Sequence, residues 1–113
     1  MHEQSIVESL LALAIENAGK VKASKILRIY LVVGDLSGVL EEAVEFYFSF
    51  LSRGTIAEGA SLFFMRAPAE VRCRNCGTVY SPENLKLQCP KCKETQIEIL
   101  AGQELYVDNM EVE

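Results

Sequence analysis

The sequence predicts an α+β fold, in which a small mixed sheet of about three strands packs with two helices and a separate cysteine-bearing domain is inserted into the chain. Three observations lead to this prediction. The chain has 113 residues and half of them are apolar, which is enough for a substantial core. Its apolar residues recur first at helical spacing and then in alternation. All four cysteines lie in one segment whose composition differs from that of the chain on either side.

The first helix is predicted to begin just after Ser5. Ser5 followed by Glu8 matches the capping box, in which the two side chains each satisfy a free backbone donor at a helix start. Apolar residues then recur at spacings of three and four until Gly19, which supplies a stop. We therefore expect residues 1–4 to lie outside the helix, with their backbone amides free.

A strand and a second helix are predicted next. Apolar residues alternate from Lys25 to Val33, which indicates a strand with one deeply buried face. Residues 41–52 predict a helix that ends before Gly54, with acidic residues near its start that suit the helix dipole. The buried side of the strand is expected to hold Leu27, Ile29, Leu31 and Val33, and the apolar side of the helix Ala43, Phe46, Tyr47 and Phe50.

Two further strands frame the cysteine segment. Residues 61–66 predict a strand rich in phenylalanine, and residues 104–112 predict a final strand that returns to the main sheet. Between them, turn residues alternate with only short strand-like pieces. The predicted domains are therefore an α/β domain of residues 1–67 and 101–113, and an inserted domain of residues 68–100.

The inserted domain is predicted to be a zinc ribbon. Its cysteines form two identical Cys-x-x-Cys pairs with twelve residues between the pairs: Cys73, Cys76, Cys89 and Cys92. Such pairs lie on tight turns and can direct four thiolates at one tetrahedral ion, for which zinc is the usual occupant. Iron in a rubredoxin-like site and a thioredoxin-type dithiol are the alternatives. Four thiolates leave no open position, so this metal should be structural and not catalytic.

Charge and composition narrow the classes of partner. The net charge is −5, and only residues 67–93 are basic, with five basic and two acidic groups. Arg72, Arg74, Lys91 and Lys93 are explained as the electrostatic complement of a four-thiolate zinc site, so we expect no nucleic-acid partner. No apolar run approaches the length that spans a bilayer, and the start lacks a signal-peptide pattern, so we expect a cytoplasmic protein without a membrane partner.

His2 has a position that suits a second metal. The α-amine of Met1, the backbone nitrogen of His2 and the His2 imidazole can close two fused chelate rings around one ion, in a nearly planar arrangement. Nickel(II) and copper(II) favour such geometry, whereas zinc gains nothing from it. No residues are arranged for nucleophilic catalysis, because this terminal histidine is the only one and the cysteines are committed to metal.

Four stretches of the chain carry a family resemblance: the opening Met-His-Glu-Gln-Ser-Ile-Val of residues 1–7, Val-Gly-Asp-Leu-Ser-Gly-Val of residues 33–39, Arg-Gly-Thr-Ile-Ala-Glu-Gly of residues 53–59, and the double Cys-x-x-Cys ribbon. Together they resemble the HypA family of nickel-delivery accessory proteins for nickel-iron hydrogenase. The resemblance runs nearly end to end. It implies a nickel site at Met1, His2 and Glu3 and a zinc site at the four cysteines.

The resemblance also implies a function and partners. We expect a nickel metallochaperone, not an enzyme, that works with the separate GTPase HypB and passes nickel to the large subunit of nickel-iron hydrogenase. Homodimer formation and service to urease are left open. The fourth nickel ligand is also left open among Glu3, a carboxylate near Glu41 and a ribbon group such as Glu98, because Leu40 stands where some members carry an acidic residue. The alternative function is a zinc-ribbon adaptor that binds a protein or nucleic acid without nickel.

Overall fold

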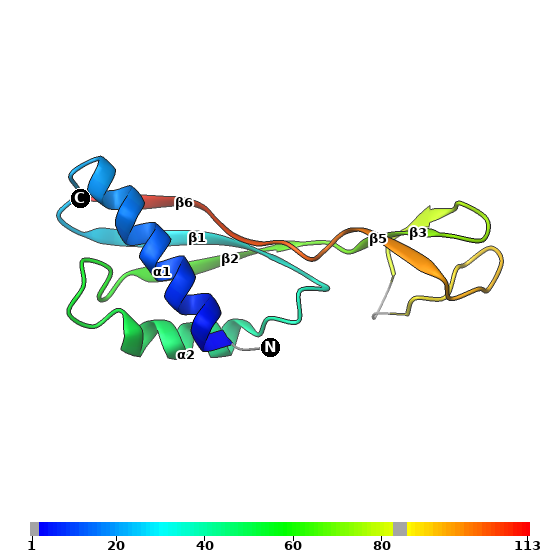
Figure 1. The fold of residues 1–113 in the computed structure, drawn as a ribbon, viewed down its shortest axis with the longest axis horizontal. Helices are drawn as coiled ribbons and strands as arrows, with labels where there is room; N and C mark the ends of the chain where they lie inside the picture. The colour runs from blue at the N-terminus through cyan, green and yellow to red at the C-terminus, as the bar shows by residue number, and fades with distance from the viewer. Residues whose placement is uncertain (1–2, 83–85) are drawn as a thin grey trace.

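The computed structural model describes residues 3–82 and 86–113, so the predicted nickel ligands Met1 and His2 lie outside the described residues. Figure 1 shows two helices against one sheet, and a second sheet that extends to the side. The molecule measures 55 × 24 × 17 Å. Its radius of gyration of 17.4 Å exceeds the value of about 13 Å expected for a compact chain of this length. The elements are α1 (Glu3–Lys20), β1 (Ile26–Gly34), α2 (Glu41–Leu51), β2 (Ser61–Ala67), β3 (Glu70–Cys73), β4 (Val79–Tyr80), β5 (Ile97–Ala101) and β6 (Leu105–Val112).

The strands form two three-stranded sheets, with orders β2-β1-β6 and β4-β3-β5. β1 pairs in parallel with β2 and antiparallel with β6, so the first sheet is mixed, and two helices accompany it as predicted. The second sheet is built from the chain between β2 and β6, which makes it an insertion. The division into folding domains at residues 67/68 and 100/101 stays a prediction.

The main core lies between the helices and one face of the first sheet, which confirms most of the predicted burial in β1. Ile29, Leu31 and Val33 are buried. Leu27 is only partly buried and Ile26 is fully buried instead. The cause is a break in the β1–β6 register between Ile26 and Arg28, since a bulge shifts which side chain faces the core.

The predicted start of α1 is wrong by a few residues. The helix begins at Glu3, so Ser5 lies in its first turns and is not its N-cap. The carboxylate of Glu3 in the first turn suits the positive end of the helix dipole, and the Gln4 amide donates to Glu8 Oε1 over 3.3 Å. The end is confirmed to within one residue, at Lys20 beside the predicted stop.

The predicted apolar side of α2 is only partly right: Ala43 and Tyr47 are partly buried, and Tyr47 packs against the core. The helix buries Val44 and Phe48, whereas Phe46 is 65% exposed and Phe50 is 50% exposed. Glu41, Glu45 and Ser49 recur every four residues on one side of this helix, and apolar residues occupy the broad remainder. Their spacing therefore did not identify which part of that broad surface packs on α1. Two exposed phenylalanines therefore remain on its outer surface.

A tight joint connects the two sheets. The amide of Gly34 donates to the carbonyl of Glu104 over 2.7 Å, and the amide of Leu36 donates to the carbonyl of Gly102 over 2.6 Å. A Cβ on Gly34 would lie 2.0 Å from the carbonyl oxygen of Gly102, so only glycine permits this approach. The turn after β1 is thereby held against the chain that leads back from the ribbon.

Within the part of the chain that the structure describes, no helix combines the length and the apolar composition needed to cross a membrane.

Candidate metal centre

The first cysteine pair lies at the end of β3 and on the turn that follows it. The amide of Cys73 donates to the carbonyl of Thr78 over 2.8 Å, and the amide of Gly77 donates to the carbonyl of Cys73 over 2.9 Å. Gly77 has a φ of 79°, a left-handed conformation that glycine adopts without strain. These bonds close the turn that carries Cys73 and Cys76.

The second pair repeats this arrangement. The amide of Cys89 donates to the carbonyl of Glu94 over 2.8 Å, and the amide of Lys93 donates to the carbonyl of Cys89 over 3.1 Å. Lys93 takes the position that Gly77 has in the first turn and has a φ of 67°. Both pairs lie on turns and neither opens a helix, so the structure does not favour a thioredoxin-type dithiol.

The two turns bring the four predicted sulfur ligands together. Cys73 Sγ lies 3.4 Å from Cys92 Sγ, and Cys76 Sγ lies 3.6 Å from Cys89 Sγ. All four sulfur atoms lie within 4.8 Å of one another. Four thiolates at the usual zinc–sulfur distance would be separated by about 3.8 Å in a tetrahedron. The cluster therefore has the donor set and the size to hold one metal ion such as zinc.

Hydrogen bonds lower the pKa of two of the cysteine thiols. The hydroxyl and the amide of Thr78 lower the pKa of Cys76 to about 6, and Thr78 Oγ1 lies 3.1 Å from its sulfur. The Asn75 side chain and then the Glu94 amide lower the pKa of Cys92. Since a metal binds the thiolate form, these contacts favour metal binding near neutral pH.

Cys73 differs from these two thiols. The Cys76 amide lowers its pKa, but burial and the neighbouring thiols outweigh that contribution and raise the pKa to about 11. Cys73 and Cys89 are buried, whereas Cys76 is exposed and Cys92 is intermediate. A bound cation would remove the need for a proton on the buried Cys73 sulfur.

Thr78 and Asn75 are contacts that the sequence prediction missed. Neither belongs to the Cys-x-x-Cys pattern, and no spacing rule distinguishes them from other polar turn residues. Arg72, one of the residues expected to complement the charge of the zinc site, forms a 3.0 Å ion pair with Glu98. The Tyr80 hydroxyl donates to the carbonyl of Leu87 and so ties β4 to the chain that leads into the second turn.

The structure describes only Glu3 among the predicted nickel ligands. Glu3 is the first residue of α1 and is partly exposed. Val7 on α1 and Val44 on α2 line the same small internal space, so the two helices begin near one another. Figure 1 likewise places the start of α1 against α2.

Apart from Glu3, the two carboxylates considered as a fourth nickel ligand, Glu41 and Glu98, both have cationic partners. Glu41 Oε2 lies 3.1 Å from Arg66 Nη1, at the start of α2. Glu98 is paired with Arg72 on the ribbon sheet, which extends away from the helices in Figure 1. The structure therefore does not bring Glu98 to the start of α1.

Comparisons with known proteins agree with this arrangement. A family model described as "Hydrogenase/urease nickel incorporation, metallochaperone, hypA" matches residues 1–112. A hydrogenase maturation factor HypA from Dehalococcoides mccartyi is 45% identical over 113 residues, which cover 100% of this chain and 95% of the relative. The corresponding protein of Caldanaerobacter subterraneus subsp. tengcongensis is 38% identical over 114 residues, with 100% of both chains covered.

Solved structures show the same fold. The solution structure of the nickel metallochaperone HypA from Helicobacter pylori matches with a TM-score of 0.70 and 31% identity, over 99% of this chain and 97% of that one. A second solution structure of a HypA protein matches with a TM-score of 0.72 and 30% identity, over 99% and 96% of the two chains. Because the family model, the relatives and the fold agree over nearly the whole length, the chain belongs to the HypA family of hydrogenase maturation metallochaperones.

Proposed function

We propose that this protein binds one nickel ion through Met1, His2 and Glu3 and delivers it for insertion into nickel-iron hydrogenase, while Cys73, Cys76, Cys89 and Cys92 hold a structural zinc ion. The observation that carries the proposal is that the family match begins at residue 1 and so includes the Met-His-Glu start. The family is one of nickel incorporation, and this start is the part of the chain whose chemistry suits nickel.

The start of α1 supports this assignment, although α1 begins earlier than the sequence predicted. The first four amides of any helix lack an intrahelical acceptor. The amide of Glu3 can therefore still bind a metal, although Glu3 is part of α1. Amine, imidazole and amide nitrogen atoms form the flat donor set that nickel(II) favours. Zinc favours the tetrahedral thiolate cluster, so donor type and geometry sort the two metals.

The two proposed metal sites also differ in accessibility, which supports a structural role for one ion and transport of the other. Two cysteine sulfurs are buried and the ring of ligands is complete, which suits a permanent ion. A cargo ion must leave on contact with a recipient, and a chelate at a chain end allows that. We propose that the large subunit of the hydrogenase is the recipient and that HypB supplies the GTPase step, since this chain has no Gly-Lys-Ser/Thr phosphate-binding loop. In this role the protein is a carrier and not an enzyme.

Blocking the amino terminus tests the proposal. Untagged protein loaded with zinc is titrated with nickel, and mass spectrometry verifies an intact Met1. Placing one glycine before Met1 should lower nickel affinity by at least about tenfold, because the α-amine is displaced from the chelate. His2→Ala should cause a similar loss, whereas Gln4→Ala, which removes a nearby exposed polar side chain, should not. If nickel affinity survives both the added glycine and His2→Ala, the zinc-ribbon adaptor becomes the better hypothesis.

A further inference from the structure

The first sheet has two outer strands, β2 and β6, and their edges differ. β6 carries Asp108 and Glu111 and contains a bulge, because its pairing with β1 shifts between Tyr30 and Leu31 and leaves Asp108 without a register partner. Charged residues and bulges are the usual means by which proteins keep an exposed edge from pairing with another strand. The β6 edge is therefore protected.

β2 lacks such protection over most of its length. Residues 61–65 have the sequence Ser-Leu-Phe-Phe-Met and contain neither charge nor proline. Among the described residues, β2 pairs only with β1, so its other edge carries backbone donors and acceptors without a strand partner. Phe63 is 44% exposed and stacks on Tyr30 with ring centroids 5.1 Å apart. An apolar, uncharged edge of this kind is a template for a further strand.

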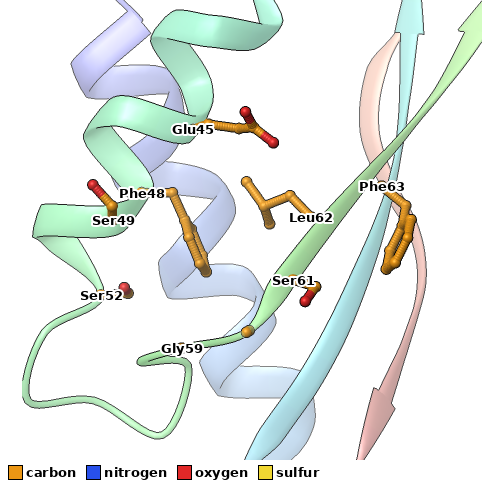
Figure 2. A pocket seen from close by; sticks show the side chains of 9 residues that line it. Glu45, Phe48, Ser49, Ser52, Gly59, Ser61, Leu62 and Phe63 are labelled. Carbon is orange, nitrogen blue, oxygen red and sulfur yellow. The ribbon is translucent and has the colours of Figure 1, made fainter.

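A groove lies beside this edge, on the side of the sheet that faces the helices. It has a volume of about 540 Å³ and lies between α2 and the start of β2. In Figure 2, Phe48 and Leu62 point into the space between helix and strand, and Phe63 lies on the far side of the strand. Glu45 and Ser49 line the helix side of the groove. An added strand would thus find a distinct surface for each of its two faces.

We propose that the β2 edge and this groove bind an extended segment of a partner protein, which adds to β2 as a fourth strand. Side chains on one face of the segment would cover Phe63 and Met65. Those on the other face would enter the groove beside Phe48. Backbone hydrogen bonds give affinity in this mode of recognition, and the alternating side chains give specificity. The proposal involves no nickel and is independent of the proposed function.

Charge identifies the chemistry of the segment. The exposed Glu45 carboxylate forms no ion pair within residues 3–82 and 86–113, in contrast to Glu41, which is paired with Arg66. α2 contains three glutamates and no basic residue. A partner segment with a lysine or arginine opposite Glu45 is therefore favoured. A second copy of this chain would instead bring another Glu45 and another net charge of −5 to the same edge.

A synthetic peptide serves as the probe. Acetyl-Val-Thr-Val-Lys-Val-Thr-Val-amide can place valines over Phe63 and its lysine in the groove. It is titrated into zinc-loaded, 15N-labelled full-length protein, and amide shifts are followed by NMR. We expect shifts along β2 and α2, and none along β6 or the ribbon. A peptide with glutamate in place of lysine should bind about threefold more weakly or worse. A peptide with prolines in place of the threonines should not bind.

Matched variants locate the site. Phe63 and Tyr106 are 44% and 46% exposed, and the register places both on the open face of the sheet, on opposite outer strands. Phe63→Lys should weaken peptide binding by at least about tenfold, and Tyr106→Lys by less than about twofold. Met65→Lys also places a charge on the surface that the peptide would cover, and it leaves the stacking of Phe63 on Tyr30 intact. It therefore tests the site even if Phe63→Lys perturbs folding. Glu45→Gln should weaken the lysine peptide by about threefold and leave a threonine-for-lysine peptide unchanged.

Three results would overturn the proposal. Equal losses from Phe63→Lys and Tyr106→Lys would show that the β2 edge is not selective. Amide shifts confined to β6 or the ribbon would place the peptide elsewhere. Self-association that Met65→Lys abolishes, without peptide binding to the monomer, would show that the occupant of the edge is a second copy.

Discussion

The sheet β2-β1-β6 and the ribbon sheet β4-β3-β5 have equal numbers of strands, yet they bury apolar side chains to different extents. The first is covered by two helices and contributes Ile26, Leu31 and Val33 to an extended core. The ribbon buries chiefly Val71 and two of its cysteines. Since apolar burial is the main source of folding free energy, the ribbon must obtain stability from another source. A metal ion held by the four cysteines would be that source, so the two regions should respond differently to the same treatments.

The largest difference should follow loss of the ribbon metal. Chelation, or Cys73→Ser, should unfold β3, β4 and β5 and leave β1 intact, because binding of a structural zinc ion contributes about 10–16 kcal/mol in small modules. Hydrogen exchange of amides in the two sheets measures this directly. Thr78→Val is the control, since it removes a hydroxyl 3.1 Å from Cys76 Sγ without removing a ligand. If the amides of both sheets lost protection together, the first sheet would also depend on the metal, contrary to this account.

A core substitution should destabilise the helix-covered sheet and leave the ribbon unaffected. Leu31 is buried beneath both helices, and Leu31→Ala should lower the free energy of unfolding of the helix-covered region by about 2–5 kcal/mol. Zinc affinity should be unchanged. Leu13→Ala, at an exposed position on α1, should cost far less. Urea unfolding followed at α1 and β1, together with a zinc competition titration, separates the two effects.

A substitution at the joint between the two regions should have a smaller effect on stability. Gly34→Ala should destabilise the protein by about 1–3 kcal/mol, because the new methyl group would meet the backbone of Gly102. Amides of Gly34 and Leu36 should exchange faster, since their bonds to the returning chain would be displaced. Gly19→Ala is the matched control: no atom lies within 4 Å of its Cβ position, and alanine favours a helix by up to about 1 kcal/mol. Equal stability of both variants would show that the joint is loose.

The smallest expected effect is a loss of stability of the first sheet at acidic pH. The Tyr30 hydroxyl donates to Glu111 over 2.8 Å, and this bond, with the neighbouring Arg28, lowers the pKa of the Glu111 carboxyl. A carboxyl whose pKa is lower in the folded state stabilises that state above its ordinary pKa and loses the contribution as pH falls through the lowered value. The stability of β1 and β6 should thus decline from about pH 5 downward, and less steeply in Glu111→Gln. Tyr30→Phe should reduce the slope as well; unchanged slopes in both variants would exclude this contribution.

The elements that the sequence predicted well are those fixed by local spacing. The two Cys-x-x-Cys turns form as expected because each closes through bonds between residues close in the chain. Alternation identified β1, and the final strand returned to the first sheet as predicted. The burial of Leu27 was wrong because a bulge depends on the partner strand, which periodicity does not reveal.

Features that depend on tertiary contacts were missed. Phe46 and Phe50 are exposed because α1 covers a different part of α2, and the broad apolar surface of this helix does not indicate which part is covered. The approach of Gly34 to Gly102 joins distant parts of the chain. The start of α1 was placed too late because a capping-box pattern occurred inside the helix. The contrast between the two sheet edges appeared only once the strand order was known.

The central claim is that two metals occupy two regions by different chemistry. The most direct measurement is the metal content and nickel absorption spectrum of untagged protein titrated with nickel in the presence of one equivalent of zinc. The account predicts that the protein retains its zinc and binds one nickel ion with a planar-site spectrum, and that a glycine added before Met1 abolishes nickel binding alone. Displacement of zinc by nickel from Cys73, Cys76, Cys89 and Cys92, with no effect of the added glycine, would contradict it.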